Sequence, residues 1–450
     1  MDTQNDVSQT NEYNKPNSKT IFEKAALGFK MFLIGFIVLL LLIPMLFIGN
    51  LITERQSRKD EVVADITEKW GSNQQIVGPY ISVPYKETEI NPNTNVSQTV
   101  IKYAHFMPEN LNYEAEPITE IRKRGIFEVI LYRSEIKIKG DFPALDLSKL
   151  DIDPARLDFE NAFLNVGISN IKGLSDFIKI DLGTQNITLE PNTKNTGIFE
   201  NGVTKKINYT QLKTQPISFK TAFIIKGAGE LQFIPIAKQT KANIKSTWSS
   251  PSFNGEFLPD AKEKVKKGFN ASWSIPLTQR MIPMSWLNNQ IDIKGYGFGV
   301  DLLLPVNNYS TADRTVKYAI LIIGLTFLVF FFIENIKGRR IHPLQYILVG
   351  FSLVLFYALL VSFSEHIDFN LAYLIASLMT TALISLYLLG VLKENKLAGF
   401  IFGTLGLLYG FIFVLVQLED FALLMGSLGL FIILAVVMYF SRKIDWYQKK

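Results

Sequence analysis

The sequence contains no cysteine and few charged residues. The absence of Cys among its 450 residues excludes disulfides, thiolate metal sites and cysteine nucleophiles. Charged residues make up 19% of the chain, whereas about 25% is usual in soluble globular proteins. Hydrophobic residues make up 48% and gather in long runs. This composition indicates a chain that lipid partly solvates. The formal charge of +5 is explained by basic residues beside membrane helices, so no nucleic-acid partner is expected.

Signatures of catalysis and cofactor binding are also missing. Residues 197–202 have two glycines at the spacing of a phosphate-binding loop, but Val203 follows where lysine is required. The chain has no Gly-x-Ser-x-Gly and no His-Glu-x-x-His. Its three histidines, His105, His342 and His366, lie in different segments and do not have the spacing of metal ligands. The sequence therefore predicts no enzyme, no cofactor and no metal site.

Six apolar runs are long enough to cross a membrane. The first, residues 31–52, continues into charged residues without a small-x-small cleavage site, so we expect an uncleaved anchor helix. Five more runs fill the last third of the chain, at residues 318–333, 344–361, 371–392, 397–418 and 421–440. They predict a helix bundle, because a membrane β-barrel would show alternating runs of roughly ten residues instead.

The middle of the chain has a different pattern. A helix rich in both charge signs is expected at residues 54–69, followed by short alternating runs typical of strands with one buried face. These runs are residues 80–83, 126–130, 136–139, 178–181, 187–189, 222–225, 231–236 and 300–304. We expect an antiparallel region resembling a sandwich or barrel, with a break between two subdomains near residues 241–252.

The predicted organisation is a membrane protein with a β-rich domain inserted between one anchor helix and five further helices. Its segments are a polar tail (1–30), the anchor (31–52), the β-rich domain (53–315), the bundle (316–441) and a second tail (442–450). One set of tails and connections carries thirteen Lys and Arg residues, whereas the opposite short connections, 362–370 and 419–420, carry none. The positive-inside rule then predicts that both termini are cytoplasmic and that the β-rich domain is periplasmic.

Four polar residues mark the outer surface of the predicted bundle. Glu365, His366, Glu419 and Asp420 lie in its two short outer connections. We expect them to join the bundle to the β-rich domain, because short connections between rigid helices position side chains well. The alternative is that they form ordinary solvated loops.

Small residues follow one face of a predicted bundle helix. Gly399, Gly403, Gly406 and Gly410 recur at spacings of four, three and four, which predicts close helix packing, with a hinge as the alternative. No ionisable residue lies near the middle of any span. Ion-coupled transporters usually place such residues there, so their absence weakens a transporter interpretation.

Several segments together resemble the CreD family of inner-membrane proteins, which are also described as cell envelope integrity proteins. The similar stretches are residues 42–45, 52–55, 77–84, 246–259, 268–273, 317–332, 342–346, 362–366 and 419–427. A histidine that the family carries shortly after Trp248 is absent here. The resemblance implies a link to a two-component regulon and to tolerance of colicins and β-lactams. It implies no catalytic or binding residues.

The working hypothesis is a non-enzymatic inner-membrane protein that supports envelope integrity. Its partners would be the lipid bilayer and an envelope protein or glycan that contacts the outer domain. The alternatives are a transporter of lipids or small molecules, an envelope sensor, and an enzyme acting on envelope glycans or lipids. The last of these would require paired acids in an outer cleft. The sequence leaves the oligomeric state open.

Overall fold

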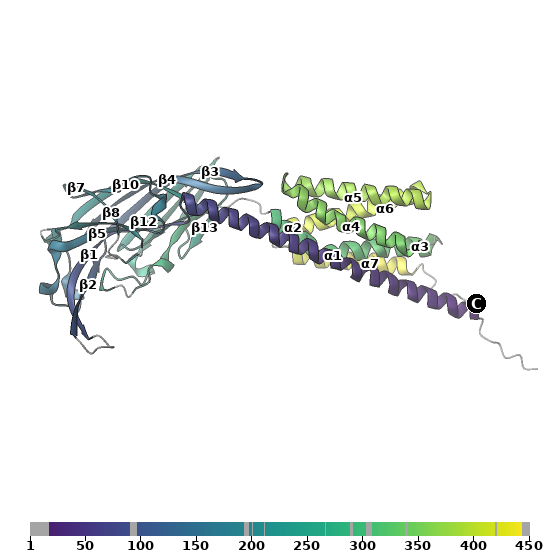
Figure 1. Ribbon diagram of the computed structural model, residues 1–450, viewed down its shortest axis with the longest axis horizontal. Helices are drawn as coiled ribbons and strands as arrows, with labels where there is room; N and C mark the ends of the chain where they lie inside the picture. Colours follow the sequence, from purple (N-terminus) through teal and green to yellow (C-terminus); the bar gives the residue numbers. More distant parts are fainter. Residues whose placement is uncertain are drawn as a thin grey trace, which may run out of the picture. The chain divides into compact units, whose positions relative to one another are not determined.

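The protein divides into a helical unit and a β unit (Figure 1). The computed structural model describes residues 18–90, 97–192, 198–199, 201–210, 212–265, 267–288, 291–302, 308–337, 341–418 and 421–442. The helical unit comprises Met1–Ser57 and Asn307–Lys450, and the β unit comprises Arg58–Val306. The first helix, α1 (Ser18–Trp70), contributes residues to both units.

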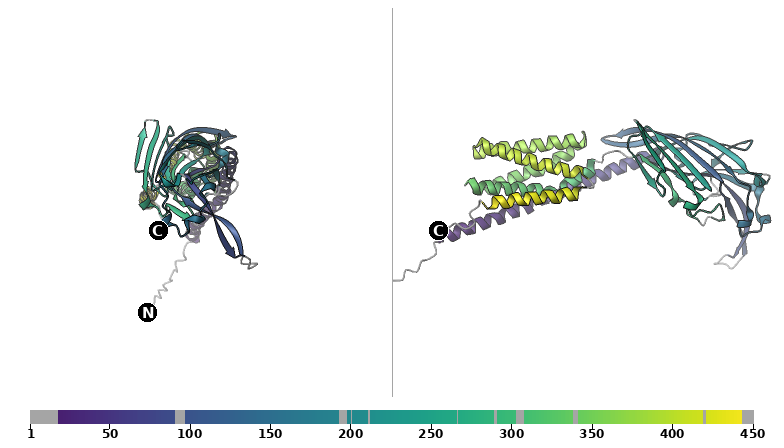
Figure 2. Two further views of the ribbon diagram at one scale, coloured as in Figure 1. Left: turned by 90° about the vertical axis from the view of Figure 1, so that its left-hand side faces the viewer. Right: turned by 180° about the vertical axis from the view of Figure 1, so that it is seen from behind.

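The described part of the helical unit contains six helices that are long and apolar enough to cross a membrane. One is N-terminal and five are C-terminal, as predicted. They are α1, α3 (Ala319–Lys337), α4 (Pro343–Ser364), α5 (Phe369–Leu392), α6 (Asn395–Gln417) and α7 (Ala422–Ser441). Helices α3 to α6 run alongside one another (Figures 1 and 2). A short helix, α2 (Asn308–Lys317), also belongs to this unit, although residues 308–315 were expected in the β-rich domain.

Local sequence explains where these helices begin and end. His342 caps α4: its ring accepts a hydrogen bond from the Leu344 N–H, while the Gln345 side chain accepts one from the His342 N–H. These bonds satisfy donors that the first helical turn leaves free. Asp368 caps α5 by accepting a bond from the Asn370 N–H at 3.0 Å. Lys393 ends α5 in a left-handed conformation.

Helix α1 packs through one buried stripe. Ile37, Leu41, Met45, Ile48 and Ile52 are all less than 9% exposed and recur every three or four residues, so they share one helical face. Residues on the opposite face, such as Phe36, Leu46 and Phe47, are exposed, as expected for side chains in lipid. The approach at Leu41 is close, because a Cβ added to Gly350 of α4 would collide with the Leu41 side chain and lie 3.1 Å from Phe327 of α3.

The β unit contains two sheets. Their strands are β1 (Gln74–Ile90), β2 (Ser97–Phe106), β3 (Asn110–Arg124), β4 (Phe127–Phe142), β5 (Ala162–Ile168), β6 (Lys179–Leu182), β7 (Gln185–Thr188), β8 (Glu190–Pro191), β9 (Gly202–Ile207), β10 (Ile217–Ala228), β11 (Glu230–Ile234), β12 (Gln239–Ser246), β13 (Pro251–Gly255), β14 (Ala261–Val265), β15 (Gly268–Pro276), β16 (Ser285–Leu287) and β17 (Phe298–Leu302). One sheet has the order β13-β17-β11-β1-β5-β9-β8, with β2 paired to β1 and β16 to β2. The other has the order β14-β15-β12-β3-β4-β10-β6-β7.

One hydrophobic core joins the two sheets. Buried and exposed residues alternate along β10 and β12, so each presents a single face to the interior. Tyr113 of one sheet stacks on Phe233 of the other, with ring centroids 4.4 Å apart. The end of α1 joins the unit through Trp70, whose indole N–H donates to the Tyr132 carbonyl at 3.3 Å. The architecture is therefore a sandwich, which is one of the two arrangements that the sequence predicted.

Three details of the sequence prediction are wrong. The region is not purely antiparallel, because β1 pairs with β11, and β3 with β12, in parallel. Alternation reveals strands but not their partners, and the long connections between these strands permit parallel pairing. Residues 241–252 are no domain break, since β12 lies inside a sheet between β3 and β15. The runs at 126–130 and 136–139 merge into the single strand β4.

We expect Gly350→Leu to destabilise the helical unit, because the new side chain would occupy space that Leu41 and Phe327 already fill. Overpacking of this kind costs about 1–3 kcal/mol. The measurement is the thermal unfolding midpoint of the purified protein in detergent. Gly403→Leu is the matched control, since a Cβ there meets no atom within 4 Å. Equal midpoints for the two variants would contradict the packing described for α1.

Candidate functional site

Polar contacts converge on Glu365 at the end of α4. Its carboxylate accepts a hydrogen bond from the Tyr309 hydroxyl of α2 at 3.1 Å, and the Arg55 Nε atom of α1 lies 3.6 Å away. The Asn308 amide donates to the neighbouring Ser364 carbonyl at 2.7 Å. Burial, and next the Glu365 charge, raise the pKa of Tyr309 well above its usual value. The carboxylate thus ties three helices of the helical unit together.

The other predicted members of this cluster contribute less to the described contacts. His366 is exposed, and its ring has no hydrogen-bond partner among the described residues. Glu419 and Asp420 lie outside the described residues. The described partners of Glu365 all belong to the helical unit. A role of the four residues in joining the two units therefore stays a prediction.

The glycine face of α6 is open. Gly399, Gly403, Gly406 and Gly410 are all exposed, and a Cβ built on any of them meets no other atom within 4 Å. The four positions share one exposed face of α6, and close packing of another helix against this face stays a prediction. Gly350 of α4 makes a close approach to α1. A lone glycine gives no periodic signal, which is why the sequence did not reveal it.

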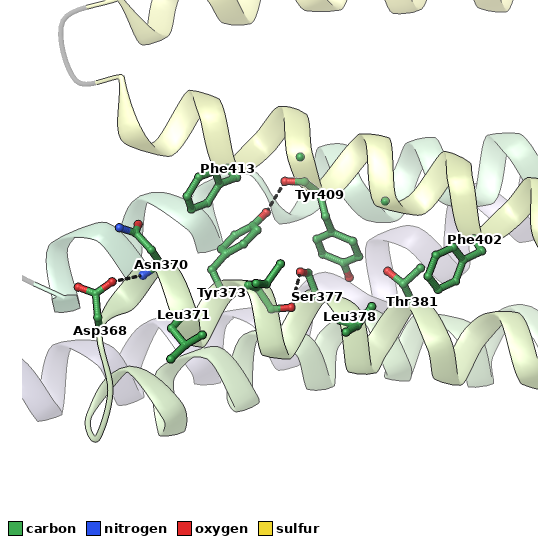
Figure 3. Close-up of a pocket in the computed structure, with 13 residues that line it drawn as sticks. Asp368, Asn370, Leu371, Tyr373, Ser377, Leu378, Thr381, Phe402, Tyr409 and Phe413 are labelled. Atoms are coloured by element: carbon green, nitrogen blue, oxygen red, sulfur yellow. Dashed lines mark hydrogen bonds between the residues drawn. The ribbon is translucent and has the colours of Figure 1, made fainter.

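Two of these glycines line a cavity between α5 and α6. Its volume is about 620 Å³, within the range typical of ligand sites. Figure 3 shows aromatic and hydroxyl side chains around it. Tyr373 donates a hydrogen bond to the Tyr409 carbonyl at 2.8 Å, and Ser377 donates to the Leu374 carbonyl at 3.0 Å. Ser377 thus bonds within its own helix, and Thr381 also lines the cavity.

The β unit contains a pair of carboxylates on neighbouring strands. Glu230 of β11 stands opposite Asp301 of β17 in the strand register. Glu230 accepts hydrogen bonds from the side-chain amides of Gln232 at 2.6 Å, Asn254 at 2.8 Å and Asn73 at 3.3 Å. Burial, and next the Glu230 charge, raise the pKa of Asp301. These half-buried acids and their amides, together with Gln75, are called the acid–amide patch below.

The acid–amide patch could not be found from the sequence. Its members come from β1, β11, β13 and β17 and from the segment before β1, so only the sheet brings them together. Each residue alone is an ordinary polar strand residue. The pairing of two acids is nevertheless the feature that an envelope-glycan enzyme would require.

A second polar network in the β unit is centred on three buried residues. The Ser82 hydroxyl lies 2.9 Å from His105 Nδ1 and accepts a hydrogen bond from the Asn165 amide at 2.9 Å. Thr204 donates to Asn165 at 2.7 Å. His105 and Ser82 are both 0% exposed, so the network satisfies core polar groups and crosses the strands β2, β1, β5 and β9. His105 is a buried strand residue, whereas His342 is a helix cap.

Within the described ranges, no three His, Cys, Asp or Glu residues come together as metal ligands.

These features define a multi-pass membrane protein in which a large β-sandwich follows an anchor helix and precedes a helix bundle along the chain. A family model described as "Inner membrane protein CreD" matches residues 26–447. A relative of the same name from Escherichia coli strain K12 is 33% identical over 441 residues, covering 94% of each chain. The chain therefore belongs to the CreD family of inner membrane proteins.

We expect Glu365→Gln and Tyr309→Phe to lower the free energy of unfolding by about 0.5–1.5 kcal/mol each, because Tyr309→Phe removes the donor of their hydrogen bond and Glu365→Gln removes the charge that faces Tyr309 and Arg55. The double variant should lose less free energy of unfolding than the two single variants together, as expected for residues that interact directly. Thermal unfolding of the purified protein provides the measurement. His366→Ala is the control and should be neutral. Strict additivity would show that the two side chains do not interact in solution.

The raised pKa of Asp301 predicts a stability that falls with increasing pH. The folded state binds this proton more tightly than the unfolded chain does. Stability is therefore lost as pH rises from about 4, the unfolded value, through the higher folded value. Asp301→Asn should raise the unfolding temperature more at about pH 7 than at about pH 4. Asp181→Asn, which removes an ion pair with Lys220, should give no such gain. If Asp301→Asn raised the unfolding temperature equally at both pH values, the raised pKa of Asp301 would be contradicted.

Proposed function

We propose that this protein is a non-enzymatic component of the inner membrane that supports envelope integrity, with its β unit contacting another envelope component. The acid–amide patch is the observation that carries this proposal. Amides and carboxylates offer paired donors and acceptors, which suit hydroxyl-rich glycans and polar protein surfaces. The amides that bond Glu230 hold its carboxylate in place, which favours a recognition role for this residue.

The proposed orientation places both termini in the cytoplasm and the β unit in the periplasm. It is supported by the distribution of basic residues. Lys393 and Lys396 lie at the connection between α5 and α6, whereas the connection between α4 and α5 contains no Lys or Arg. With six spans, this bias puts the β unit on the side opposite to the lysines.

A glycan-cleaving enzyme is the second candidate, favoured by the position of Asp301 beside Glu230 and by its raised pKa. Glycosidases use two carboxyl groups, one of which has a raised pKa. In that case Asp301→Asn should abolish the envelope phenotype while capture of the partner continues. If the patch only binds, the phenotype and the capture should change together.

A single introduced cysteine tests the proposal, because the chain has no other thiol. Gly295→Cys places it beside the patch, at an exposed position where a Cβ meets no atom within 4 Å. A membrane-impermeant thiol-reactive crosslinker should capture an envelope component from cells with a permeabilised outer membrane. Adding Glu230→Gln and Asn254→Ala should abolish the adduct. Gln185→Cys, exposed on β7 of the other sheet, is the control and should capture nothing.

Two results would count against the proposal. Labelling of Gly295→Cys only after the inner membrane is broken would show that the orientation is reversed. Labelling without any adduct, or an adduct that survives the patch substitutions, would show that the patch is not the contact surface.

A further inference from the structure

The cavity between α5 and α6 has the form of a lipid groove. All of its lining residues belong to these two helices or to the cap of α5, and both helices are membrane spans. It extends along α5 from Asp368 to Thr381, which corresponds to roughly 20 Å at a rise of 1.5 Å per residue. Half of a hydrocarbon core is roughly 15 Å thick. The groove is therefore long enough for one acyl chain from one leaflet.

The walls of the groove fit an acyl chain. Gly406 and Gly410 leave open space where larger residues would project. Leu374, Leu378 and Phe402 border it and are 61%, 55% and 43% exposed, so they offer apolar surface to an occupant. An apolar molecule in a membrane gains little from burial alone. Shape complementarity at the glycines would then provide the selectivity for a particular site.

The mouth of the groove is acidic. The Asp368 carboxylate is exposed and has no ion-pair partner among the described residues, whereas Glu365 already has Arg55 nearby. The chain segment 362–370 contains no Lys or Arg. Asn370 and Gln417 form a hydrogen bond beside the mouth. This arrangement favours a cationic headgroup and disfavours an anionic one.

A buried hydroxyl in the wall lacks a partner. Tyr409 is 2% exposed, and its hydroxyl has no hydrogen-bond partner among the described residues. Figure 3 shows its ring pointing from α6 toward α5, among the side chains that line the groove. An unpaired buried hydroxyl is costly. An ester carbonyl of a lipid drawn into the groove would supply the missing acceptor.

We propose that this groove binds one phospholipid with an ammonium headgroup, taken from the leaflet on the side of Asp368. The ammonium group pairs with Asp368, and one acyl chain lies along Gly406 and Gly410. A second copy of this chain is a poorer occupant, because the glycines line a concave cavity rather than the flat face that two crossing helices require.

Native mass spectrometry of the purified full chain tests this inference. The probes are dioleoyl-phosphatidylethanolamine and dioleoyl-phosphatidylglycerol, which have the same acyl chains and differ in headgroup charge. The wild type should retain one phosphatidylethanolamine per chain, with a preference of at least about tenfold over phosphatidylglycerol. Asp368→Asn keeps a capping side chain and should abolish that preference.

Substitutions of α6 glycines inside and outside the groove test whether the lipid binds in the groove or elsewhere on the same helix face. Gly406→Leu and Gly410→Leu should each weaken phosphatidylethanolamine binding at least about tenfold, because leucine fills the groove. Gly399→Leu lies on the same helix face outside the cavity and should bind like the wild type. The proposal would be overturned if the wild type retained the two lipids equally. It would also be overturned if Gly399→Leu weakened phosphatidylethanolamine binding as much as Gly406→Leu and Gly410→Leu do. A wild-type dimer that Gly406→Leu dissociates would likewise overturn it, because the glycine face of α6 would then join two copies of the chain.

Discussion

Helix α1 is held by an ion pair near each end of its apolar stretch, and these two pairs attach it to α3 and to the end of α4. Lys30 pairs with Glu334 of α3, and Arg55 approaches Glu365 of α4. The two basic residues are 25 positions apart, or roughly 37 Å along a helix. This exceeds a hydrocarbon core of roughly 30 Å and is less than a whole bilayer of roughly 40–45 Å. Both pairs therefore fit the headgroup regions.

The pair at Glu334 meets the conditions under which a buried charge is tolerated. Glu334 is only 8% exposed, and its two oxygens also accept bonds from the Ile341 N–H and the Tyr346 hydroxyl, both at 3.2 Å. A buried carboxylate whose two oxygens both accept hydrogen bonds avoids much of the desolvation cost. The buried stripe of α1 between the two pairs contributes apolar packing. The ends and the middle of the helix are thus stabilised by different forces.

The sequence predicted the membrane helices well, because hydropathy over about 20 residues is a local property. Strands were found by alternation, another local signal, but the parallel pairs β1–β11 and β3–β12 depend on chain segments far apart. The same limit applies to α1, since nothing near Lys30 identifies Glu334 as its partner. Glycine periodicity on α6 identified a face correctly but could not say whether a helix or a cavity lies against it.

For the candidate sites, the sequence selected positions without their partners. Glu365 was singled out, yet its contacts with Tyr309 and Arg55 come from two other helices. Glu230 and Asp301 were not singled out at all, because two strands of one sheet bring them together. Asp368 falls in the connection between α4 and α5, and its place at the mouth of a cavity depends on how α5 packs beside α6. Pair geometry, rather than residue type, was the missing information.

The double attachment of α1 also fixes how many residues the anchor can contain. One residue inserted or deleted between Lys30 and Arg55 would turn the remainder of the helix by about 100° and shift it by about 1.5 Å. The stripe that includes Leu41 and Met45 would then leave its contact surface on one side of the change. The anchor therefore tolerates substitutions on its lipid face but not changes in length, so its residue count is as much a part of the fold as its hydrophobicity.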